Sequence, residues 1–302
     1  MSNVNEYKDI VAYHPGYYIA DIIEDMEISQ AELAKKIDYK YFVDVIGLPI
    51  ARSINEKVAN LCKYFKVADL RIMLQPDFLV NFRSSASCNS EKNVINSRAW
   101  IQTAINISKS IETKPYNAER LKGYLPELRG MTVKKPEEFL PRMREIFAEC
   151  GVAFVLLPHL KNSGVNGAVK WVSEDRVVLA MNNRGLDADK FWFSLFHEIK
   201  HVLQQKIKTV FISSTVEEMK DINDKLEIEA DKFAMNYLIP PADYKRLAPT
   251  KYTSDDEIVE FAKSIGIHPG IVAGRLQHEG IIAQNRCSKL KEKYVIEIKH
   301  IA

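Results

Sequence analysis

The sequence lacks closely spaced cysteine pairs. Its four cysteines are scattered along the chain, and no two of them form a Cys-x-x-Cys pair: Cys62, Cys88, Cys150 and Cys287. This spacing argues against a disulfide framework and against a cysteine zinc knuckle. Scattered free thiols are typical of a reducing compartment, so we expect a cytoplasmic protein.

Signals for export or membrane insertion are also lacking. The first ten residues, MSNVNEYKDI, contain no basic segment followed by an apolar stretch. No apolar run approaches the roughly 20 residues that a bilayer-spanning helix needs. We therefore expect a soluble protein that does not contact a membrane.

Charge of one sign is not in excess. The formal net charge is +2, and charged residues make up 27% of the 302 residues. This balance does not point to nucleic acid as a partner, although a balanced total can contain a local basic face. The charged fraction and an apolar share of 46% are ordinary for globular proteins, and the length allows two domains.

Three short apolar runs in the middle of the chain predict a small sheet. They are residues 152–157, 168–172 and 176–181, and only Ser173-Glu174-Asp175 separates the last two, which predicts a hairpin. We expect the three strands to form an antiparallel sheet. A further alternating segment, residues 294–299, is a candidate late strand.

Most of the remaining periodic sequence predicts helices, so the expected fold class is mainly α with a small antiparallel sheet, an α+β fold. Apolar residues recur at helical spacing in several segments: 100–111, 139–150, 187–206, 216–238, 255–265 and 269–278. By contrast, prolines and glycines interrupt residues 114–136, where we expect no long helix.

The N-terminal part predicts two short helices with a tight joint, the pattern of a helix-turn-helix. His14-Pro15-Gly16 predicts a turn, and Ser29 with Glu32 three residues later predicts a capping box at the second helix. The polar residues 84–92 indicate a linker. The expected division is a helix-turn-helix-like domain over 1–83, a linker and connecting helix over 84–130, and a third part over 131–302.

The strongest chemical pattern is His-Glu-Ile-Lys-His at residues 197–201, inside an apolar helix. His197 and His201 are one helical turn apart, so both imidazoles can reach one zinc ion at roughly 2.0–2.1 Å. Glu198 can take a proton from a metal-bound water and return it to a leaving amine. The alternative is a surface pair of histidines, which the directly preceding Phe196 disfavours. The pattern predicts one Zn²⁺ per chain and peptide hydrolysis.

A third ligand is expected from the acidic helix downstream. Glu227 and Asp231 are four residues apart and share one helical face, whereas Glu229 points about 200° away from Glu227. We therefore prefer Glu227 to Glu229 as the ligand. Asp231 is then placed to accept a hydrogen bond from a ligand imidazole and to fix its tautomer. A solvated acidic helix face is the alternative reading of these residues.

The C-terminal part of the chain resembles the ImmA/IrrE family of metallo-endopeptidases. The resemblance spans roughly residues 135–285 and rests on three stretches: residues 191–201, residues 227–234 together with 238–240, and residues 268–278. It implies a zincin-like domain with a gluzincin-type site and intracellular cleavage of helix-turn-helix repressors. One departure is Lys200, where the family commonly has glycine. Lysine is a good helix former and would point off the ligand face, so we expect metal binding to be kept.

The N-terminal part is similar to the Xre-type helix-turn-helix of HigA-like antitoxins, on His14-Pro15-Gly16 and on residues 29–34. The expected recognition helix falls near residues 39–46, which are mostly apolar or aromatic. Base readout needs polar side chains, and only Lys40 and Arg52 are nearby. DNA binding through residues 14–60 and docking of a partner protein therefore stay open. A homodimer also stays open, since such domains often act as dimers.

Two functions follow from these patterns. The first is a zinc endopeptidase that cleaves a repressor or antitoxin-like protein encoded nearby, with Glu198 as general base. The alternative is an antitoxin-like regulator or binding module of a toxin-antitoxin or mobile-element system that keeps the peptidase fold without turnover. The presence of Glu198 favours the enzyme, because metal binding alone does not need it. Arg275 lies on a helix that can line the cleft, where a cation would stabilise an oxyanion.

Overall fold

The computed structural model describes residues 5–7, 10–12, 28–74, 81–84, 91–182, 187–204, 216–247, 250 and 253–294. Near the N-terminus β1 (Asn5–Tyr7) pairs antiparallel with β2 (Ile10–Ala12). The centre of the fold is a second sheet with strand order β3-β5-β6-β4. Its strands are β3 (Asn81–Ser84), β4 (Val152–Leu157), β5 (Val165–Ser173) and β6 (Arg176–Asn182).

The sheet is mixed. The prediction of an antiparallel sheet is therefore wrong for one strand, β4, while the α+β fold class is confirmed. Strands β5 and β6 form the predicted antiparallel hairpin, but β4 pairs parallel with β6, from Val152 opposite Val177 to Leu157 opposite Asn182. The hairpin returns β6 between β4 and β5. Every residue of β4 is buried, as is usual for strands covered on both faces.

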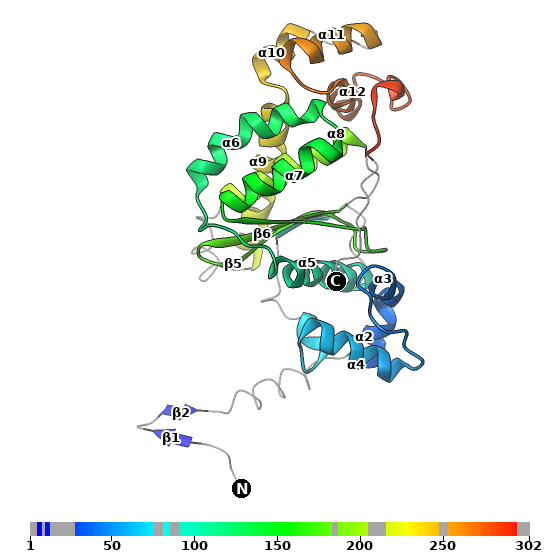
Figure 1. Cartoon of the computed structure of the whole chain (residues 1–302), viewed down its shortest axis with the longest axis vertical. Coiled ribbons are helices and arrows are strands. Elements are labelled where there is room, and N and C mark those ends of the chain that lie inside the picture. Colours follow the sequence, from blue (N-terminus) through cyan, green and yellow to red (C-terminus); the bar gives the residue numbers. More distant parts are fainter. Residues whose placement is uncertain are drawn as a thin grey trace.

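Alternate residues of β4 serve two apolar clusters on opposite faces of the sheet. Val152, Phe154 and Leu156 belong to the cluster under the C-terminal helices, whereas Ala153 and Val155 belong to the cluster with the N-terminal helices. Figure 1 shows the sheet between α7 and α8 on one side and α5 on the other. The sheet therefore lies between the two clusters and contacts helices of both halves of the chain, and the boundaries expected at 83 and 130 stay a prediction.

The N-terminal part that the structure describes contains four short helices and one long helix, α5. They are α2 (Gln30–Lys36), α3 (Tyr39–Asp44), α4 (Ile54–Phe65), the 3-10 helix η1 (Leu70–Leu74) and α5 (Glu91–Ser108). The predicted capping box is confirmed: the Ser29 hydroxyl accepts from the Glu32 N–H at 3.2 Å, and the Ser29 N–H donates to the Glu32 carboxylate at 3.0 Å. The expected turn at His14 and the helix after it lie outside the described residues.

The expected recognition helix faces the core. α3 buries Tyr39, Tyr41 and Phe42. The Tyr39 hydroxyl donates to the Pro49 carbonyl at 2.7 Å, and the Tyr41 hydroxyl donates to the Pro158 carbonyl at 3.1 Å. These aromatic side chains therefore hold α3 against the rest of the molecule.

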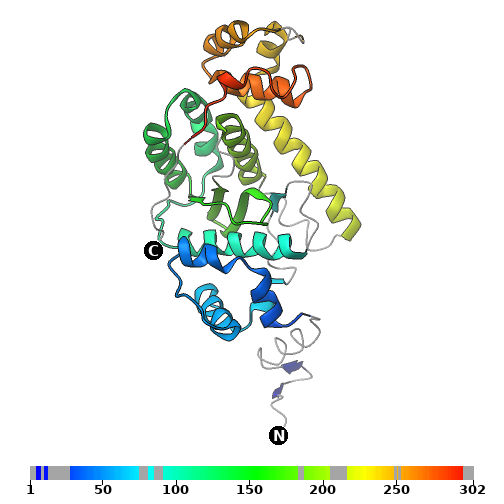
Figure 2. The same cartoon turned by 90° about the vertical axis from the view of Figure 1, so that its right-hand side faces the viewer.

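Helices α7 and α8 of the C-terminal part cover the other face of the sheet. The helices of the C-terminal part are α6 (Ala118–Gly130), η3 (Met131–Val133), α7 (Pro136–Glu149), α8 (Ala188–Leu203), α9 (Val216–Leu238), α10 (Pro241–Leu247), α11 (Asp255–Ile265), α12 (Pro269–His278) and η6 (Ser288–Leu290). Figure 2 shows α9 as a long diagonal helix that runs from the group α10–α12 past the sheet.

Helix α6 contradicts the expectation of an interrupted segment over 114–136. It contains Pro126, yet it begins at an Asn117 cap and continues to Gly130. Leu121, Leu125 and Leu128 are buried along one face. Burial of this face outweighs the local preference of proline and glycine, because tertiary packing routinely overrides helix propensity.

The end of the described chain is tied to α8. The indole N–H of Trp192 donates to the Tyr294 hydroxyl at 2.7 Å in the core. Apart from Tyr294, the strand expected over 294–299 lies outside the described residues. Within the part of the chain that the structure describes, no helix is long and apolar enough to cross a bilayer.

Candidate metal centre

The His-Glu-Ile-Lys-His pattern lies in the second half of α8. His197 and Glu198 are fully buried, and His201 is 5% exposed. The apolar side chains of the helix, including Phe196 and Ile199, belong to the large core cluster under the sheet. This packing fixes the rotation of α8 about its axis, and the rotation sets where the two imidazoles point.

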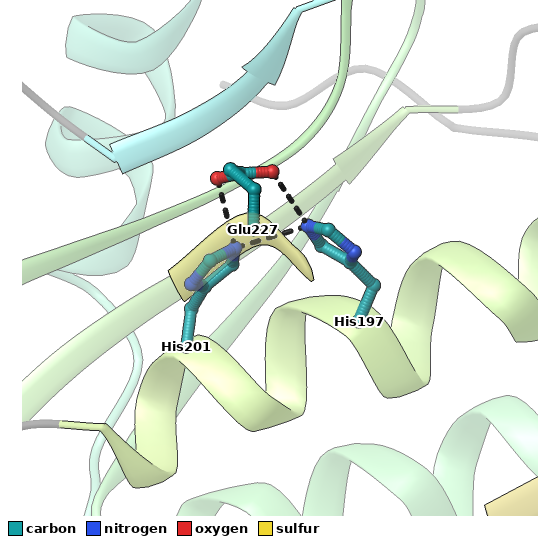
Figure 3. Close-up of side chains that lie close together, drawn as sticks. All are labelled: His197, His201 and Glu227. Carbon is teal, nitrogen blue, oxygen red and sulfur yellow. Dashed lines mark hydrogen bonds and ion pairs between the residues drawn. The ribbon is translucent and has the colours of Figure 1, made fainter. Parts of the chain in front are cut away.

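The two histidines of α8 and one glutamate of α9 converge on a single point (Figure 3). The Nε2 atoms of His197 and His201 are 3.0 Å apart. Each lies 3.2 Å from one oxygen of the Glu227 carboxylate. One ligand atom from each residue lies within 4.8 Å of the others, so the three side chains can hold one metal ion.

Hydrogen bonds to the other ring nitrogens fix the orientation of both imidazoles. His197 Nδ1 lies 2.9 Å from the Asp231 carboxylate, which only accepts, so this nitrogen carries the proton. His201 Nδ1 lies 2.9 Å from Gln204 Oε1. The amide orientation of Gln204 is itself fixed, because its Nε2 donates to the Leu226 carbonyl at 3.4 Å and to Glu229 at 3.3 Å.

The resulting tautomers suit a metal ion. With both Nδ1 atoms protonated, each neutral imidazole turns the Nε2 lone pair toward the other and toward Glu227. The lone pairs of the two Nε2 atoms and the two Glu227 oxygens then face one another with no hydrogen atom between them. These electron-rich atoms repel one another unless they share a bound cation. Two histidine nitrogens and a carboxylate are a donor set that Zn²⁺ takes in catalytic sites, with a further position left for water or substrate.

Glu227 is held ionised at this point. Burial alone would raise the pKa of its carboxyl group, but the adjacent His197 and His201 imidazoles outweigh burial and lower the pKa to about 2. A ligand carboxylate must be ionised to bind a metal, and a pKa of about 2 keeps this one ionised at neutral pH.

The competing glutamate lies elsewhere. Glu229 forms an ion pair with Lys200 at 3.4 Å and contacts the Gln204 amide. Lys200 thus points away from the imidazoles and toward an exposed part of α9. The Lys200 side chain therefore does not cover the cluster formed by His197, His201 and Glu227.

Glu198 packs against strand β5 at Gly167. A Cβ atom placed on Gly167 would lie 2.6 Å from Glu198 Cγ and 2.7 Å from its Oε1. The backbone of Gly167 is not in the left-handed region, so the space and not the dihedral angles requires glycine. The close approach lets the buried Glu198 carboxylate pack directly on the sheet.

Arg275 lies on α12, next to a cavity rather than among the ligand atoms. Its guanidinium lies 4.8 Å from the centre of the Tyr244 ring and forms an ion pair with Glu279. It lines the same cavity as Ser194 of α8. Its role in stabilising an oxyanion stays a prediction.

Two residues of the site were not found from the sequence. Gln204 is three residues after His201 on the same helix, so its spacing was a usable signal. Gly167 carried no such signal, because its contact with Glu198 depends on how the sheet packs on α8.

Residues 157–277 match the sequence family described as Peptidase_M78: IrrE N-terminal-like domain. The match covers less than half of the chain, and it contains β5, β6, α8 and α9. It supports the resemblance to the ImmA/IrrE family and a metallopeptidase-like fold, and it does not reach the helix-turn-helix part. A comparison with curated proteins finds no match.

Proposed function

We propose that the chain is a zinc-dependent endopeptidase. The observation that carries the proposal is the convergence of His197 Nε2, His201 Nε2 and the Glu227 carboxylate, with both imidazole tautomers fixed from outside. A buried carboxylate, Glu198, follows the first ligand directly. The family match over 157–277 supports the same chemistry.

The roles of the residues follow from their positions. A zinc ion in this cluster would lower the pKa of a coordinated water toward about 7 and polarise a peptide carbonyl. As general base, Glu198 would take a proton from that coordinated water and return it to the leaving amine. Asp231 and Gln204 hold the two imidazoles in the binding tautomer and orientation.

The substrate that we propose is a cytoplasmic regulatory protein, a helix-turn-helix repressor or antitoxin-like protein encoded nearby. This rests on the resemblance to the ImmA/IrrE family. The N-terminal helices are proposed to contact protein rather than DNA, because α3 turns its aromatic residues into the core. The alternative is a regulator that keeps the fold without turnover.

Co-expression with helix-turn-helix proteins encoded nearby tests the proposal. The wild-type chain is expected to cut one of them, and intact-mass analysis then gives the cleavage site. Glu198→Gln, purified with the same zinc content, is expected to leave that protein whole. Equal cleavage by the two chains, or none by either, contradicts the enzyme and favours the regulator.

A further inference from the structure

A cavity of about 320 Å³ lies between α8, α9 and α12. This volume is near the lower end of the range of about 300–1,000 Å³ for ligand pockets. The cavity contains none of the metal ligands, yet its walls belong to the same elements that carry them.

The two ligand-bearing helices lead from the metal cluster into this cavity. On α8, Ser194 lines the cavity, and His197 follows three residues later on the same face. On α9, Met235 lines the cavity, and Asp231 precedes it by one turn. The faces of both helices that carry the metal site therefore continue as cavity wall.

The sheet also connects the metal cluster with the cavity. Asn166 of β5 lines the cavity, and its neighbour Gly167 contacts the Glu198 carboxylate. The aromatic ring of Phe193, also in the wall, lies 6.5 Å from the His197 ring, centre to centre. A group bound at the metal cluster thus has this cavity beside it, on the side of the general base.

The wall is mainly apolar, and its charges are paired within the protein. Apolar side chains come from all three helices and from β6, among them Met181, Phe191, Leu238 and Ile271. Asp189 pairs with Lys291 at 2.8 Å, and Arg275 pairs with Glu279. Because each of these charges already has an oppositely charged partner, a charged group entering the cavity would lose its hydration without gaining an unpaired counter-ion. Asp189 Oδ1 and Arg275 Nη1, which have no hydrogen-bond partner among the described residues, can still bond an uncharged polar group such as a tyrosine hydroxyl.

We propose that this cavity binds one large uncharged side chain of the substrate, next to the peptide bond that is cut. Leucine, methionine, phenylalanine and tyrosine side chains fit the apolar wall, whereas aspartate, glutamate, lysine and arginine do not. The inference rests on the proposed function, since it assigns the substrate preference of the same enzyme. Its binding step is separable from catalysis.

The binding test uses metal-free protein with ¹³C-labelled methionine methyl groups. N-acetyl-phenylalaninamide is expected to shift the Met181 and Met235 signals in a saturable manner, with Met143, which is buried on α7 and does not line the cavity, as internal reference. N-acetyl-glutamic acid amide is expected to leave them in place. Equal shifts with both compounds, or none with either, overturn the inference.

The matched variants are Met235→Trp, which fills the cavity, and Asn236→Trp, which places the same ring on the exposed side of α9. Only the first is expected to abolish the phenylalaninamide shifts. Met235→Ala, which enlarges the cavity, covers the case in which the larger ring prevents folding: it is expected to keep the shift at Met181.

The cleavage test uses the zinc-loaded full chain and peptides from a digested cell lysate. Cut sites are expected to be enriched at least tenfold for large uncharged residues on one side of the bond. Met235→Trp should lose this enrichment, and Asn236→Trp should keep it. Binding without any cleavage upholds the cavity and contradicts the endopeptidase, whereas cleavage without side-chain preference upholds the endopeptidase and contradicts the cavity.

Discussion

Replacing Gly167 by alanine tests the placement of Glu198, the proposed general base. The new Cβ would lie 2.6–2.8 Å from Cγ, Cδ and Oε1 of Glu198. Since non-bonded carbon atoms prefer about 3.5–4.0 Å, the carboxylate has to move by about 1 Å. A displacement of this size costs about 10²-fold in rate, and loss of a general base costs about 10²–10⁴-fold.

The Gly167→Ala variant should lose turnover and keep the metal, because the added Cβ atom contacts Glu198 and not one of the proposed metal ligands. Peptide cleavage by zinc-loaded protein is expected to fall at least about 10²-fold, with zinc affinity unchanged. Gly123→Ala is the matched control: Gly123 is helical and has nothing within 4 Å of an added Cβ. That variant is expected to cleave at the wild-type rate.

Stability measurements check the same contact without using activity. Overpacking by one methyl group costs about 1–3 kcal/mol, so Gly167→Ala should lower the free energy of unfolding of the metal-free chain by this amount. In a Glu198→Ala background the obstructing atoms are gone, and the cost should vanish. The same loss in both backgrounds would refute the packing of Glu198 on Gly167.

Three further predictions concern Asp231, His268 and Arg275. Asp231→Asn should weaken zinc affinity by about 10–100-fold because it disturbs the tautomer of a ligand, whereas the exposed Lys232→Gln should not; equal affinities in competition with a chelator would contradict the role of Asp231. Burial lowers the pKa of His268 from 6.5, against the opposing effect of Glu292, and its Nδ1 accepts from the Gly270 N–H at 3.1 Å. Since its folded pKa is below the unfolded one, its contribution to stability is complete above pH 6.5 and is lost as the pH falls through the folded pKa. His268→Asn should therefore flatten the fall in melting temperature between pH 7.5 and pH 5, and an unchanged slope would argue against it. If Arg275 stabilises an oxyanion, Arg275→Ala should lower kcat by about 10²–10³-fold at constant zinc content, and an unchanged rate removes that role.

Features that depend on local spacing could be predicted from the sequence. The separation of His197 and His201 by one turn, and of Glu227 and Asp231 by one turn, follows from helix geometry alone. The structure brings His197, His201 and Glu227 to one point and places Asp231 against the outer ring nitrogen of His197. The capping box at Ser29 is equally local, and it forms as expected.

Features that depend on distant packing could not be predicted. The apolar run of β4 fits a parallel or an antiparallel partner. The direction of pairing is decided only by the position of β6, which lies between β4 and β5. Helix α6 continues through Pro126 because its leucines are buried by other helices. The contact of Gly167 with Glu198 arises only where β5 meets α8.

Zinc titration of the metal-free chain, in competition with a coloured chelator, tests the metal centre most directly. The structure predicts one tight site per chain, lost in His197→Ala and in Glu227→Ala. Glu229→Gln should keep that site, since Glu229 contacts Lys200 and Gln204 instead. Zinc binding that survives His197→Ala, or that is lost in Glu229→Gln but kept in Glu227→Ala, would contradict the centre described above.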